Sequence, residues 1–142
     1  SRFIHVAHGV VRTDAETPLS ERLLAIHKEL RKLLSKYDPS EAGVEELFFS
    51  RNASSAMQVA HARGVVLLAL GQRGIPVECY SPQHVKQAVI GRGKADKDQV
   101  QRLVSVVLGL DKVPTPDHAA DALAVAICHA NRRQAYVQQR YR

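Results

Sequence analysis

Carboxylates and one histidine gather in two short segments of the sequence. Glu45 and Glu46 are adjacent, and Asp117, His118 and Asp121 share a second short stretch. Carboxylate and imidazole groups are hard or borderline ligands that suit Mg²⁺ or Mn²⁺. Two such ions about 4 Å apart can activate a water molecule and stabilise the leaving oxygen of a phosphodiester. The residue types therefore indicate a divalent-cation site with hydrolytic chemistry.

Glu45 and Glu46 lie in a short, buried strand that we predict over residues 43–49. Side chains alternate along a strand, so only one of the two acids can share the exposed face. The other must point elsewhere and needs a partner. A solvated strand end without a further role is the alternative.

The second acidic segment belongs to a helix predicted over residues 116–132, where Pro116 suits the first turn. His118 and Asp121 are three residues apart and share one face. Asp121 borders the apolar stripe, where a half-buried carboxylate is costly unless it is paired or binds a cation. Asp117 is better interpreted as a helix-start acid stabilised by the helix dipole. The stripe consists of Ala120, Leu123, Ala124 and Ile127.

Hydrophobic periodicity and helix-breaking residues predict the elements that position these side chains. A long amphipathic helix should begin at Pro18 and end at Asp38–Pro39. Asp96 and Gln99 form an approximate capping box for a later helix. Alternating strands and helices indicate an α/β fold, with a parallel or mixed sheet that carries its site beyond the strands' carboxyl ends. Further strands are expected at residues 3–12 (one or two) and 75–80, and further helices at residues 53–72, 82–89 and 97–108.

The composition indicates one compact domain over residues 1–142. Twenty Lys and Arg against 14 Asp and Glu give a net charge of +6, which favours a polyanionic partner, although ribosome-associated and merely soluble basic proteins share it. Cys79 and Cys128 resemble reduced structural thiols. We find no leader peptide and no apolar run long enough to span a bilayer, so we expect a cytoplasmic protein without a membrane partner.

Three blocks of sequence match a known pattern: VEELFFSRNASSA with QVAHARG (residues 44–64), YSPQHVKQAVIGRG with ADKDQV (80–100), and HAADALAVA (118–126). They resemble the second catalytic block, the basic middle block and the last catalytic block of RuvC-family Holliday-junction resolvases. The blocks keep their order and spacing over about residues 10–130, which is far more specific than any single motif.

The resemblance implies a ribonuclease H-like mixed sheet flanked by helices, a homodimer, and metal-dependent nicking of two symmetric strands of a four-way DNA junction. It implies two Mg²⁺ or Mn²⁺ ions per site, with Glu45, His118 and Asp121 as ligands. Lys86 and Lys97 match lysines near the scissile phosphate, where Lys97 would stabilise the charge that develops on phosphorus. A branch-migration helicase is the further partner that the family implies.

One departure concerns the first, central strand of the family's sheet. In the family this strand ends in an Asp-Pro-Gly motif whose Asp binds metal, and the present sequence holds no equivalent. Without that strand, sheet edges would be left unpaired. We therefore expect an additional N-terminal segment in the natural protein, and little or no cleavage by the chain as printed.

Aromatic and basic residues supply candidate DNA contacts. Phe48 and Phe49 cannot both face the core at one strand end, so either one is a loop anchor or one wedges at the junction crossover beside Arg51, as the family implies. The loop with Arg92 and Lys94 would contact phosphate, since its glycines permit close backbone approach; a merely solvated loop is the alternative. The basic tail, residues 131–142, either adds salt-dependent affinity or is disordered.

Ala56, Ala60 and Gly64 form a ridge of small residues on one helix face. A glycine inside a helix costs up to about 1 kcal/mol relative to alanine, so close packing is a plausible compensation. The ridge could pack on the sheet, or it could form the dimer interface that the family implies. Six other histidines show no metal spacing, and we assign no role to His5, His8, His27, His61, His84 and His129.

Two alternative functions stay open on the sequence alone. A junction-binding protein that does not cut would show binding without Mg²⁺-stimulated nicks. A ribonuclease H-like nuclease for RNA or ordinary duplex would show no preference for four-way over linear DNA at matched salt.

Overall fold

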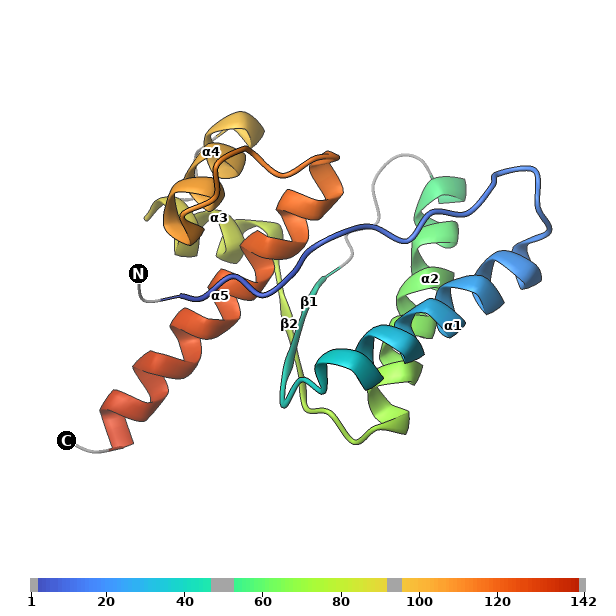
Figure 1. The fold of residues 1–142 in the computed structure, drawn as a ribbon, viewed down its shortest axis with the longest axis horizontal. Coiled ribbons are helices and arrows are strands. Elements are labelled where there is room, and N and C mark those ends of the chain that lie inside the picture. Colours follow the sequence, from blue (N-terminus) through green and yellow to red (C-terminus); the bar gives the residue numbers. More distant parts are fainter. Residues whose placement is uncertain (1–2, 47–52, 92–95, 141–142) are drawn as a thin grey trace. The chain divides into compact units, whose positions relative to one another are not determined.

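The computed structural model describes residues 3–46, 53–91 and 96–140, for which five helices and two strands are defined (Figure 1). The two strands pair as a small parallel sheet. Ala42 N–H donates to the Pro76 carbonyl and Glu46 N–H donates to the Tyr80 carbonyl, so the residue number rises in the same direction along both strands. The elements are α1 (Leu19–Tyr37), β1 (Ala42–Glu45), α2 (Ala53–Gln72), β2 (Val77–Tyr80), α3 (Pro82–Ile90), α4 (Lys97–Leu108) and α5 (Asp117–Arg140).

The chain divides into two compact units. Unit 1 contains Ser1–Val10, Gly43–Glu46 and Glu78–Arg142, and unit 2 contains Val11–Ala42 and Leu47–Val77. Every predicted catalytic residue belongs to unit 1. Among the described residues, no helix combines the length and the apolar character that crossing a bilayer requires.

Unit 2 is built on the packing of α1 against α2. Helix α1 follows Pro18 and ends where Asp38 adopts a left-handed conformation and donates its N–H to the Leu34 carbonyl at 2.9 Å. Leu34 of α1 and Ala69 and Leu70 of α2 are buried. Both helices keep the bounds that the sequence predicts.

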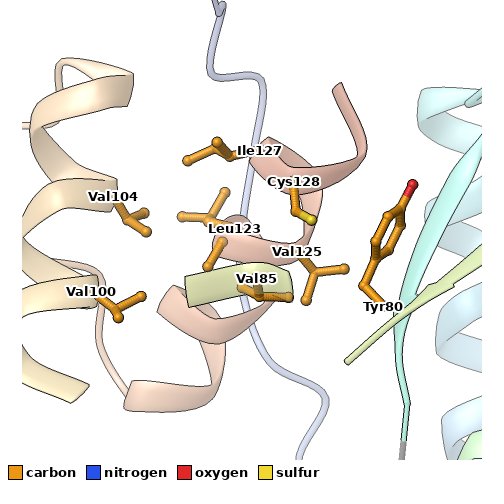
Figure 2. Packing of buried hydrophobic residues seen from close by; sticks show 9 residues of the cluster. Tyr80, Val85, Val100, Val104, Leu123, Val125, Ile127 and Cys128 are labelled. Atoms are coloured by element: carbon orange, nitrogen blue, oxygen red, sulfur yellow. The ribbon is translucent and has the colours of Figure 1, made fainter. Parts of the chain in front are cut away.

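Unit 1 has a hydrophobic core between β2 and helices α3, α4 and α5. Figure 2 shows Val100 and Val104 of α4 on one side of Leu123 and Ile127, and the Tyr80 ring on the other side of α5. Burying a valine or leucine side chain stabilises the fold by about 1.5–3 kcal/mol. This core fixes the three helices that carry most of the predicted site.

Local caps set the starts of α3 and α4. Ser81 Oγ accepts the His84 N–H at 3.1 Å, with proline as the first helical residue. In the capping box of α4, Asp96 Oδ1 accepts the Gln99 N–H at 2.8 Å, and Gln99 Oε1 accepts the Asp96 N–H at 3.2 Å. The predicted capping box is confirmed, and it places Lys97 at the first position of α4.

The prediction of one or two strands at residues 3–12 is wrong for the described structure, which assigns no strand there. Phe3 packs against the core of unit 1, whereas Ile4 and Val6 are exposed. A β-branched composition favours extended backbone, but a strand also needs a neighbouring backbone to pair with. The segment finds no such neighbour among the described residues.

Two other predictions need correction. Strand β1 is only partly buried and ends at Glu45, whereas we expected a buried strand over residues 43–49; residues 47–49 lie outside the described part. The basic tail is not a loose end up to Arg140, because α5 continues to that residue. No proline or glycine interrupts residues 117–140, so nothing in the sequence stops the helix at Arg132.

Candidate active site

The carboxyl end of β1 presents Glu45. The strand reaches this point through its pairing with β2, where Glu46 N–H donates to the Tyr80 carbonyl at 2.8 Å. Glu45 is exposed as a whole residue, yet partial burial of its carboxyl group raises its pKa above the ordinary value of 4.5. The charge of Asp121 raises that pKa further, and the charge of Lys97 lowers it. Glu45 is therefore within electrostatic range of both residues.

Lys97 joins two acids of α5. Its Nζ lies 3.6 Å from Asp117 Oδ2 and 3.7 Å from Asp121 Oδ2. Asp121 keeps 35% of its side-chain surface exposed, against 64% for Asp117. The half-buried carboxylate at Asp121 thus has the partner that its position requires. That partner comes from the neighbouring helix α4 rather than from its own helix, so spacing along α5 could not reveal it.

His118 lies one turn before Asp121 on α5, with Nδ1 4.0 Å from Asp121 Oδ2. Its side chain is 84% exposed. The predicted shared face of the two residues is thus present. An exposed imidazole beside a half-buried carboxylate can turn toward a ligand without a large rearrangement of the core.

The ligand atoms at this site are of the types that bind a hard divalent cation. They are the carboxylate oxygens of Glu45 and Asp121 and the imidazole nitrogen of His118. A positive charge is already drawn to these acids, namely the ammonium of Lys97. Within residues 3–46, 53–91 and 96–140, however, no three His, Cys, Asp or Glu side chains stand ready as a metal-binding group. The role of these residues as ligands therefore stays a prediction.

A further set of contacts fixes β1 and β2 against α5. Tyr80 is 2% exposed, and its hydroxyl lies 2.6 Å from His129 Nδ1. A Cβ atom added at Gly43 would lie 3.1 Å from His129 Cβ and 3.3 Å from Val125 Cγ1. The strand that carries Glu45 can approach the helix that carries Asp121 this closely because residue 43 has no side chain.

Sequence reasoning missed the parts played by several residues. His129 received no role, yet it binds Tyr80. Asp117 was interpreted as a helix-start acid only, yet it shares Lys97 with Asp121. Both contacts join residues that are distant in the chain, so no local spacing signals them. A buried tyrosine needs a hydrogen-bond partner, and that requirement was the one available clue.

Of the other predicted DNA-contacting residues, the structure describes one. Lys86 is a partly buried residue of α3. The residues Phe48, Phe49, Arg51, Arg92 and Lys94 lie outside the described part of the chain. Their roles stay predictions.

The small-residue ridge lies on α2 in unit 2. Ala56 and Ala60 are partly buried, but Gly64 is exposed, and a Cβ atom added there would meet no atom of the described residues within 4 Å. Packing of the ridge on the sheet stays an alternative. The dimer interpretation of the ridge stays a prediction.

Comparison with known proteins places the chain in a family. The model for "Crossover junction endodeoxyribonuclease RuvC" matches residues 1–129. The chain is 50% identical to the RuvC protein of Desulfitobacterium hafniense over 131 residues, which cover 92% of the chain and 79% of the relative. It is 47% identical to that of Petrotoga mobilis over 139 residues, covering 98% and 85%.

Solved structures agree with the sequence matches. The structure of Thermus thermophilus RuvC superposes with a TM-score of 0.79, and that of T. thermophilus RuvC in complex with a Holliday junction substrate superposes with 0.82. Each is 43% identical and covers 86% of the chain and 74% of the known structure. These neighbours confirm the predicted ribonuclease H-like α/β fold. The chain belongs to the RuvC family of crossover junction endodeoxyribonucleases.

Proposed function

We propose that this protein is a metal-dependent endonuclease that resolves four-way DNA junctions by nicking two symmetric strands, in DNA recombination and repair. The observation that carries the proposal is the electrostatic coupling of Glu45, Asp121 and Lys97, which come from β1, α5 and α4. Membership of the RuvC family supports the same reaction and substrate.

Glu45, Asp121 and His118 would hold Mg²⁺ or Mn²⁺, which we propose as two ions per site. Bound ions of this kind activate water and stabilise the leaving oxygen of a phosphodiester. Asp117 is more exposed than Asp121 and shares Lys97 with it, so we assign Asp117 to orienting the lysine rather than to the cation.

Lys97 would neutralise the charge that develops on the reacting phosphate. Its flexible stem begins at the first residue of α4, where the helix dipole also favours an anion. The N-terminus of α5, at Asp117, is close enough for the 3.6 Å contact with Lys97. The basic side chain and two helix starts therefore make a favourable place for one phosphate.

A homodimer would present two such sites to the two equivalent strands of a junction. The support lies on α2, where Met57, His61, Gly64 and Leu68 are exposed at steps of four, three and four residues. Met57 is 53% and Leu68 55% exposed, which leaves an apolar stripe beside the small-residue ridge. Such a stripe suits a helix pair across a two-fold axis. The helicase partner rests on the family resemblance alone.

Cleavage of a labelled synthetic junction tests the proposal. The assay uses the printed chain and the chain extended by the family's first strand, since the resemblance implies a further carboxylate ligand there. We expect the extended chain to make paired nicks that require Mg²⁺ or Mn²⁺, and the printed chain to cut little or not at all. Asp121→Asn should abolish cutting and spare binding. Binding without metal-stimulated nicks in the extended chain would favour a non-cleaving junction protein, and equal cutting of linear duplex would favour a less selective nuclease.

Lys97→Gln should lower the single-turnover rate by about 10²–10³-fold, the usual cost of losing one group that stabilises transition-state charge. Lys97→Arg keeps the charge and should recover part of the rate. The matched control is Lys112→Gln, an exposed lysine outside the site. A rate unchanged in Lys97→Gln would remove the lysine from the mechanism.

A further inference from the structure

Unit 2 carries a strongly basic groove that the active site does not use. The groove has a volume of about 880 Å³ and lies along α1 and the C-terminal end of α2. Among the described residues, eight line the groove, of which five are cationic and none is acidic. The cations are Lys28, Arg31, Lys32, Lys36 and Arg73.

The lysines form a regular row. Lys28, Lys32 and Lys36 follow one another at steps of four residues along α1, and a helix rises 1.5 Å per residue, so successive lysines are about 6 Å apart along the axis. The row thus spans about 12 Å, and duplex DNA presents about seven phosphates over that length. Like charges four residues apart repel one another within a helix, and a polyanion in the groove would relieve that repulsion.

Few carboxylates of the described residues neutralise these cations. Arg73 binds Asp38, with Nη2 3.0 Å from Oδ1. Lys36 lies over the Tyr37 ring, 5.1 Å from its centroid. Within the described ranges, Lys28, Arg31 and Lys32 form no ion pair with a carboxylate, and all three are exposed.

The lining also distinguishes among polyanionic partners. Protein interfaces are centred on apolar and aromatic side chains, whereas Ala69 is the single apolar residue among the described residues that line this groove. Sites for single-stranded nucleic acid stack bases on aromatic rings, and no aromatic side chain of residues 3–46, 53–91 and 96–140 lines the groove. A row of cations with one small apolar residue and no aromatic ring beside it fits the backbone of a duplex, where phosphate oxygens are the charged groups.

We propose that the Lys28–Lys32–Lys36 groove binds the phosphate backbone of a duplex DNA arm, as a second DNA contact made by residues outside the active site. The inference extends the proposed function, since a four-way junction supplies duplex arms. It assigns the groove a role in affinity and not in sequence recognition or chemistry, because phosphate contacts carry no base information.

The test is the salt dependence of DNA binding, measured without divalent metal. The triple variant Lys28→Gln, Lys32→Gln, Lys36→Gln should lower the slope of log affinity against log salt by about 0.9 for each phosphate that the variant no longer neutralises. The triple arginine variant at the same positions should keep the wild-type slope. The charge-matched control replaces three exposed cations elsewhere with glutamine, namely Arg12, Arg102 and Lys112.

A glutamine variant with the wild-type slope would overturn the proposal, and so would a control whose slope falls as far, since net charge would then explain the effect. Thermal unfolding checks that the glutamine variant folds; it should be no less stable than wild type, because the repulsion along α1 is removed. Measurement on linear duplex as well as on junctions separates the two proposals. Equal wild-type affinity for both substrates would contradict junction selectivity but would leave the groove proposal standing. The difference in salt slope between wild type and the glutamine variant would still test the groove.

Discussion

One lysine in the candidate site holds together acids that would otherwise repel one another. Lys97 contacts Asp117 and Asp121 and lowers the pKa of Glu45, while burial and Asp121 raise it. The residue types and the His118–Asp121 spacing could be predicted, because they are local. The link between α4 and α5 through Lys97 could not, since it depends on how the helices pack.

Glu45→Gln should stabilise the metal-free protein at neutral pH. The pKa of Glu45 is raised in the folded state, so the native protein binds this proton more tightly than the unfolded chain does. Below the ordinary value of 4.5 the group is protonated in both states and the substitution should have little effect. As pH rises from there through the raised pKa, ionisation of Glu45 costs stability that glutamine avoids. Thermal unfolding in EDTA at pH 4 and pH 7.5 measures this difference.

The control for that experiment is Glu46→Gln, the adjacent acid at the same strand end. The Glu46→Gln variant should not show a rise in melting temperature over wild type that is larger at pH 7.5 than at pH 4. A Glu45→Gln variant that is less stable than wild type at pH 7.5 would show that the carboxylate is satisfied in the metal-free state, contrary to the strain that burial and Asp121 impose.

The elements were predicted best where their ends are encoded locally. Pro18 and Asp38 bound α1, and Asp96 and Gln99 begin α4, as the sequence indicates. Predictions failed where an element depends on distant partners or on the absence of a stop signal. The segment over residues 3–12 has strand composition but no pairing neighbour among the described residues, and α5 runs past Arg132 because nothing breaks it.

Gly43→Ala should weaken the attachment of β1 to α5. The new methyl group would lie 3.1 Å from His129 Cβ and 3.3 Å from both Tyr80 Cε2 and Val125 Cγ1. Overpacking of this kind costs about 1–3 kcal/mol. The strand end that carries Glu45 would shift, so metal-dependent cleavage should fall along with stability. Chemical denaturation and the junction assay measure the two effects.

Gly71→Ala is the matched control, because Gly71 lies in α2 and the added atom would have no neighbour within 4 Å in the described part of the chain. It should leave cleavage unchanged and gain up to about 1 kcal/mol from helix propensity. Equal losses in both variants would mean that close packing at Gly43 has no special part in placing Glu45.

For the whole molecule, family membership could be predicted from the order and spacing of three sequence blocks, and the α/β class from the alternation of strands and helices. The single resolvase domain and the dimer remain predictions. Composition could suggest a polyanionic partner but could not locate the basic groove, since its cations come from α1 and from the residue that follows α2.

Leu68→Glu should disrupt the proposed homodimer by placing a charge on the exposed stripe of α2. We expect a shift toward monomer in sedimentation velocity, and junction nicks that are no longer paired, because each site would then act alone. Leu24→Glu is the control, since Leu24 is similarly exposed at 51% but belongs to α1. Paired nicking that persists in the Leu68→Glu variant would place the dimer interface elsewhere.

The central claim is that Glu45 and Asp121 bind the same divalent cations. Manganese binding followed by electron paramagnetic resonance tests it most directly, on wild type, Glu45→Gln, Asp121→Asn and the control Asp117→Asn, in the printed and the extended chain. We predict that the first two substitutions each weaken Mn²⁺ binding strongly, and that Asp117→Asn leaves it near wild type. Unchanged Mn²⁺ binding in Glu45→Gln and Asp121→Asn would contradict the account.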